Sequence, residues 1–79
     1  MPMDDIPWSK RTLGVLIEEG MLDELTAAVA TDWARGQSIV QTAMRRGISE
    51  RAVSGYRQKI RVTYDRVAVY AELPPRRMR

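Results

Sequence analysis

The first half of the chain carries two blocks of apolar residues at helical spacing. The first block follows Ser9, which can cap a helix, and reaches about Glu19, where Gly20 ends it; its inward face is Leu13, Leu16 and Ile17. The second block starts near Asp23, which can also act as a cap, and ends at Gly36; its inward face is Leu22, Leu25, Val29 and Trp33. The pattern predicts two amphipathic helices.

Residues 38–60 contain a third pattern, which predicts two short helices joined by a tight turn. Ser38 and Gln41 can form a capping box at the start of the first helix. Gly47 can adopt the left-handed conformation of the turn, and Ser49 can cap the second helix. The second helix then buries a stripe made of Val53, Tyr56 and Ile60.

The second helix of this motif leaves a polar and basic face on the side opposite its buried stripe. We call it the reading face; it consists of Arg51, Ser54, Gly55 and Gln58, with Lys59 at its edge. Two helices, a glycine turn and such a face are the sequence form of a DNA-binding helix-turn-helix. The alternative is a helical hairpin with no role in DNA binding, since short motifs also match by chance.

The packing positions of the motif resemble those of bacterial helix-turn-helix regulators; they are Ala43, Gly47, Ile48, Val53 and Tyr56. Residues 36–39 leading into 47–53 are similar to the LuxR-type module. The TrfB-type plasmid repressors are a closer likeness, carried by residues 51–54, 64–67 and 73–74. The resemblance implies a small phage- or plasmid-type regulator. Two residues depart from the pattern: Arg46 stands where a leucine is usual, and Gly55 where a base-contacting side chain is common.

The stretch after Ile60 fits two structures. Strand-favouring residues and an alternating pattern from Arg66 to Leu73 indicate a short strand. One long helix is also possible, because an apolar seam repeats every seven residues at Val53, Ile60 and Val67 and no Gly or Pro interrupts the run from Tyr56 to Leu73. The TrfB-type resemblance favours a helix to about Val62 and then the strand. The predicted fold is therefore mainly α: a four-helix helix-turn-helix domain with a short C-terminal strand, or an extended last helix, used for dimerisation.

Composition limits the chemistry that the chain can carry out. The 79 residues include no Cys and no His, so disulfides and metal sites built on these residues are excluded. No Ser lies in a nucleophile motif and no glycine-rich phosphate loop exists, so we expect neither an enzyme nor a cofactor. No apolar run approaches about 20 residues and no signal-peptide layout is present, which predicts a cytoplasmic protein without a membrane partner.

Charge divides the chain into two halves. Residues 1–34 hold seven acidic and two basic residues, whereas residues 35–79 hold eleven basic and three acidic ones. The basic half contains the motif, as expected of a nucleic-acid-binding face; the alternative is a solvated surface with unevenly shared charge. The predicted organisation is an irregular arm over residues 1–8, one domain over 9–73 and a basic tail over 74–79.

The motif supplies the candidate DNA contacts. Base reading is assigned to Arg51, with Ser54 and Gln58 in support, because an arginine in the first turn of the second motif helix can pair with guanine O6 and N7. The alternative is that Arg51 pairs with Glu50 or Asp65 on the surface. The candidate phosphate contacts are Ser38, Arg45, Ser49, Arg57, Lys59 and Arg61.

The apolar segment 60–73 is longer than a domain of this size is expected to bury, which predicts a homodimer. Its candidate contacts are Tyr64, Val67, Val69, Tyr70 and Leu73. We therefore expect a homodimeric repressor that binds double-stranded DNA at a palindromic operator and takes no small-molecule ligand. The alternative is a small inhibitor that uses the same helical shell to bind a protein, such as a phage-encoded inhibitor of a nucleic-acid-binding complex.

Overall fold

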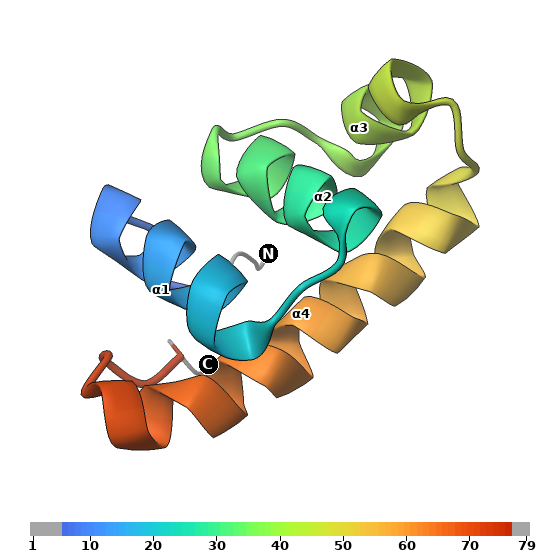
Figure 1. The fold of residues 1–79 in the computed structure, drawn as a ribbon. Coiled ribbons are helices and arrows are strands. Elements are labelled where there is room, and N and C mark those ends of the chain that lie inside the picture. Colours follow the sequence, from blue (N-terminus) through green and yellow to red (C-terminus); the bar gives the residue numbers. More distant parts are fainter. Residues whose placement is uncertain (1–5, 77–79) are drawn as a thin grey trace.

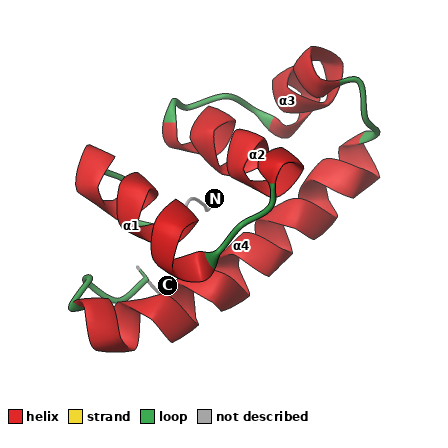
Figure 2. Ribbon diagram, in the orientation of Figure 1, coloured by secondary structure: helices red, strands yellow, loops and turns green. Residues whose placement is uncertain are grey.

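Four helices pack around one hydrophobic core in the computed structural model, which describes residues 6–76. They are α1 (Lys10–Gly20), α2 (Glu24–Ala34), α3 (Ile39–Arg46) and α4 (Glu50–Ala71). The longest helix, α4, contacts each of the other three and runs beneath them, from α3 at one end to α1 at the other (Figure 1). The described residues form helices and loops only (Figure 2). The prediction of a mainly helical fold is confirmed.

The last helix corrects the preferred sequence interpretation. α4 continues as a helix to Ala71, so the strand predicted from Arg66 to Leu73 is wrong and the long-helix alternative holds. The helix places one row of side chains against the other helices, all of them fully buried: Val53, Ile60, Tyr64 and Val67. The free energy gained by burying this row exceeds the cost of placing β-branched residues, which prefer strands, in a helix.

The first two helices begin and end close to the predicted residues. Ser9 Oγ and Asp23 Oδ1 accept hydrogen bonds from the backbone N–H groups three residues further on, at 3.0 and 2.8 Å. α1 ends at Gly20, but the left-handed residue that terminates it is Met21, with φ 54°. The conformation of the helix end therefore does not explain the glycine at position 20.

Gly20 instead allows α1 to approach α4 closely. A Cβ atom on Gly20 would lie 2.5 Å from Thr63 Cγ2, which belongs to a buried and stiff β-branched side chain. We expect Gly20→Ala to lower the free energy of unfolding by about 1–3 kcal/mol through overpacking, as measured by urea denaturation.

Gly14→Ala is the matched control, because a Cβ atom at Gly14 meets nothing within 4 Å. This second variant should be slightly more stable than the wild type, since alanine favours the helix. If Gly20→Ala is as stable as Gly14→Ala, the close approach of α1 to α4 does not require a glycine at position 20.

The segments before α1 and after α4 both pack against the core. Ile6 is 1% exposed, and Trp8 packs edge-on against Trp33 with ring centroids 5.5 Å apart. After α4, the Tyr64 hydroxyl donates a hydrogen bond to the carbonyl of Pro74. Burial raises the pKa of Tyr64, so this hydroxyl keeps the proton that it donates.

Part of the predicted arm and tail lies outside the described residues, namely 1–5 and 77–79. The described part of the tail is tied to α4. Arg76 donates from Nε and Nη2 to the Asp65 carboxylate at 2.8 and 2.9 Å, in a two-pronged pair.

Candidate nucleic-acid interface

The motif predicted over residues 38–60 forms with the expected local geometry. Ser38 Oγ accepts from the N–H of Gln41 at 3.0 Å while Gln41 Oε1 accepts from the N–H of Ser38 at 2.8 Å, which completes the capping box. Gly47 has φ 68°, the left-handed conformation expected of the turn. Ser49 Oγ caps α4 by accepting from the backbone of Ala52 at 3.0 Å. These local predictions are confirmed.

Small and apolar side chains hold α3 against α4. Ala43 is 6% exposed and Val53 is fully buried, and Ile48 in the turn packs against the same core. The N–H of Ile48 donates to the carbonyl of Ala43 at 3.0 Å, so the turn is fixed by backbone as well as by side chains. The start of α4 is therefore held rigidly relative to α3.

Arg46, which departs from the family pattern, binds a buried carboxylate. Its Nε and Nη2 atoms donate to Asp32 Oδ2 and Oδ1 at 2.9 Å each, and Asp32 is 0% exposed. These hydrogen bonds raise the pKa of Arg46 above its ordinary value, so the guanidinium stays charged. Arg45 Nε lies 3.8 Å from the same carboxylate. A charged clamp thus ties α3 to α2 at the position where a leucine is usual.

Every residue of the reading face is exposed on α4, and the structure brings them together as predicted. Arg51 takes part in no ion pair or side-chain hydrogen bond within residues 6–76, so its predicted alternative pairing with Glu50 or Asp65 is not formed there. Gln58 Oε1 accepts a hydrogen bond of 3.3 Å from Arg61. The guanidinium of Arg51 is therefore a cationic group that this face presents to solvent without a partner in the described part of the chain.

Two of the predicted phosphate contacts face the core instead of the motif surface. The guanidinium carbons of Arg57 and Arg61 lie 4.6 and 5.1 Å from the centroid of the Trp33 ring, in cation–π geometry. Arg57 Nη2 also donates to the carbonyl of Gln37 at 2.8 Å. Both arginines are half-buried, so in this conformation they stabilise the packing of α4 on α2 and are poorly placed to contact phosphate.

The other predicted phosphate contacts are exposed, namely Ser38, Arg45, Ser49 and Lys59. Lys59 Nζ lies 3.9 Å from Asp23 Oδ2, and the side chains of both residues are exposed. The hydroxyl and N–H of Thr26, and to a smaller degree Lys59, lower the pKa of Asp23. An exposed pair of this kind is weak, so Lys59 can exchange this partner for another anion.

The predicted dimer contacts divide into buried and exposed residues. Tyr64 and Val67 are fully buried and Leu73 is 7% exposed, so these three belong to the core of the subunit and their assignment to a dimer surface is wrong for this fold. Tyr64 and Val67 are buried because they occupy the inward row of α4. Leu73 is buried after the left-handed Glu72 ends the helix, where the N–H of Leu73 donates to the carbonyl of Ala68. Val69 and Tyr70 are exposed at 82% and 55%, as a dimer surface requires. Val62, which the sequence interpretation missed, is 60% exposed.

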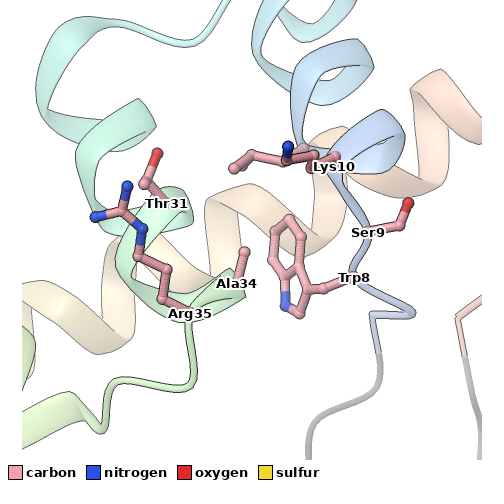
Figure 3. A pocket seen from close by; sticks show the side chains of 7 residues that line it. Trp8, Ser9, Lys10, Thr31, Ala34 and Arg35 are labelled. Carbon is pink, nitrogen blue, oxygen red and sulfur yellow. The ribbon is translucent and has the colours of Figure 1, made fainter.

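A cleft of about 390 Å³ lies between the start of α1 and the end of α2 (Figure 3). Trp8 and Lys10 line it from one side and Thr31 and Arg35 from the other, and none of the predicted DNA or dimer contacts lines it. Within the described residues, no three acidic side chains gather closely enough to hold a metal ion. No helix among them has the length and apolar character needed to cross a bilayer.

Comparison of the chain with protein-family models, with curated proteins and with solved structures gives no match in any of the three.

Proposed function

We propose that this protein is a sequence-specific DNA-binding repressor that acts in the cytoplasm as a homodimer on a palindromic operator. The observation that carries the proposal is the exposed polar face at the start of α4, where Arg51 has no ion pair within residues 6–76 and is followed on the same face by Ser54 and Gln58. A helix held on its other side by three neighbours can place such a face in the major groove of DNA.

Three features support helix-turn-helix docking. α3 and α4 are joined by a capped glycine turn, and the first turn of α4 carries an exposed arginine. The Arg46–Asp32 clamp and the buried Ala43 fix α3, which in this docking mode crosses the DNA backbone. The resemblance of the motif to TrfB-type and LuxR-type regulators points the same way, and it favours a phage- or plasmid-type repressor.

The exposed apolar residues of α4 suit a dimer that reads a palindrome. Val62 and Val69 are exposed two turns apart on α4, and contact between two copies through these residues would form the homodimer that a palindromic operator requires. Tyr70, exposed beside Val69, would extend the contact.

The test of the proposal is the substitution Arg51→Ala. The DNA is a duplex that the wild-type protein enriches from a randomised library, and the reference is a scrambled duplex of the same composition. We expect a loss of about 1–3 kcal/mol in binding to the enriched duplex and a much smaller loss with the scrambled one, at a single salt concentration.

Arg11→Ala serves as the control, since Arg11 is an exposed arginine of α1 in the acidic half of the chain. It should bind both duplexes as the wild type does. An equal loss with both duplexes for Arg51→Ala would make Arg51 a phosphate contact, and no loss with either would remove α4 from the interface. Failure of the wild type to enrich any sequence would contradict the proposed function itself.

The second candidate is a protein-binding inhibitor, and one observation favours it. Val40 and Met44, one turn apart on α3, are exposed at 49% and 79%, which is unusual for apolar side chains on a small helical domain. A protein partner would cover them. DNA binding that is insensitive to salt and shows no preference among sequences would favour this candidate.

A further inference from the structure

Gly55 lies inside α4 without any structural requirement for a glycine. It is exposed, its helix continues for more than a turn on both sides, and a Cβ atom placed on it would meet nothing within 4 Å. Glycine is among the least favourable residues in a helix interior, because it loses the most backbone entropy on folding. The fold would thus be more stable with alanine here, so the fold does not account for the glycine.

The surroundings of Gly55 suggest what the bare backbone serves. Arg51 lies one turn before it and Gln58 about one turn after it, and both side chains are exposed on the same face. Gly55 is thus the lowest point in the middle of the reading face, between two long polar side chains. No helix of the described chain covers it.

We propose that Gly55 determines how deeply α4 enters the major groove, and thereby makes base reading by Arg51 and Gln58 effective. This inference rests on the proposed DNA-binding function. The backbone N–H of Gly55 lies within the helix, so the contact at this point is van der Waals packing against the edges of the bases, where a thymine methyl group is one fitting surface.

The absence of a side chain at Gly55 matters because hydrogen bonds to base edges form only over a short range of distances. A Cβ atom would extend the surface of α4 by about one carbon–carbon bond, roughly 1.5 Å. Hydrogen bonds weaken sharply when their donor–acceptor distance increases by that much, so a helix displaced by one methyl group loses contacts to base edges. Contacts to phosphate, made by long and flexible side chains around the rim, tolerate the same displacement.

Gly14 provides an internal comparison within the same chain. It also lies in the interior of a helix, is exposed, and has open space around the position of a Cβ atom. It belongs to α1, outside the reading face and in the acidic half of the sequence. Alanine at either position should therefore stabilise the fold in the same way, while only position 55 should affect DNA binding.

The experiment compares Gly55→Ala, Gly14→Ala and the wild type on the enriched and scrambled duplexes. We expect the melting temperature to rise by about 3–8 °C in both variants. Gly55→Ala should lose about ten-fold or more in affinity for the enriched duplex, comparable with the loss of one base contact, while its affinity for scrambled DNA stays within about two-fold. Gly14→Ala should bind both duplexes like the wild type.

Other outcomes overturn the inference in distinguishable ways. If Gly55→Ala binds the enriched duplex as tightly as the wild type, groove depth does not depend on Gly55, although the proposed function stands. If Gly55→Ala loses equal affinity for the enriched and the scrambled duplex, the added methyl group hinders DNA binding of any sequence and not base reading. If Gly14→Ala loses as much affinity as Gly55→Ala, the effect comes from replacing a helical glycine and not from the position of Gly55. If the wild type enriches no sequence, the proposed function has failed before Gly55 is tested.

Discussion

Replacing Arg46 with methionine is expected to destabilise the protein more than any other single change to its charged residues. The substitution keeps the bulk of the side chain but leaves the Asp32 carboxylate fully buried without its two hydrogen bonds of 2.9 Å. A buried carboxylate that loses its partner costs about 3–5 kcal/mol, a large part of the stability of a small domain. Urea denaturation monitored by tryptophan fluorescence measures the loss.

The reciprocal substitution should cost less, and the difference tests the explanation. In Asp32→Asn, the side chain of Arg46 remains 28% exposed and can be hydrated, so its charge is not stranded. The double variant Asp32→Leu with Arg46→Met replaces the pair with apolar side chains and should recover much of the stability lost in Arg46→Met. If Arg46→Met is as stable as the wild type, Arg45 or water satisfies Asp32 and the clamp is not essential.

Features that depend on a few neighbouring residues could be predicted from the sequence. The capping box of Ser38 and Gln41, the Ser49 cap and the left-handed Gly47 all form as predicted, because each involves residues no more than about four positions apart. The reading face was also predictable, since the spacing of residues within one helix decides which of them point away from the core.

The end of α4 could not be predicted in this way, because its conformation depends on distant residues. Residues 62–70 are rich in strand-favouring types, which left a strand and a helix both open, and the TrfB-type resemblance then led to the wrong strand. In the folded protein, α1 lies against the C-terminal half of α4 (Figure 1), with Gly20 next to Thr63 and the Tyr70 hydroxyl 3.5 Å from the Glu19 carbonyl. The helical form gains these contacts, which no local pattern reveals.

The roles of the arginines illustrate the same limit. Arg57 and Arg61 look like Arg45 and Arg51 in the sequence, as cations in the basic half. Only the position of Trp33 on α2 distinguishes them, because its ring lies beneath two successive turns of α4. The sequence did contain a signal for this contact. Trp33 was predicted to be buried, and Arg57 and Arg61 are four residues apart near the edge of the inward face of α4.

DNA binding is expected to weaken by roughly 10²–10³-fold between 50 and 200 mM salt, as for a dimer that contacts about four to six phosphates. This range follows from the structure: Arg45 and Lys59 are exposed near the motif, while Arg57 and Arg61 are held over Trp33. Fluorescence anisotropy on the scrambled duplex, over a series of salt concentrations, measures the slope of log K against log salt.

Two substitutions separate the arginines that contact phosphate from those that stabilise the fold. Arg45→Ala should reduce the slope by about 2 for a dimer, because each subunit releases about one counterion fewer. Arg61→Ala should leave the slope unchanged and lower the melting temperature instead, since it removes a cation stacked on Trp33. If Arg61→Ala reduces the slope as much as Arg45→Ala does, Arg61 leaves the Trp33 ring to bind DNA. A slope near zero for the wild type would favour a protein partner over DNA.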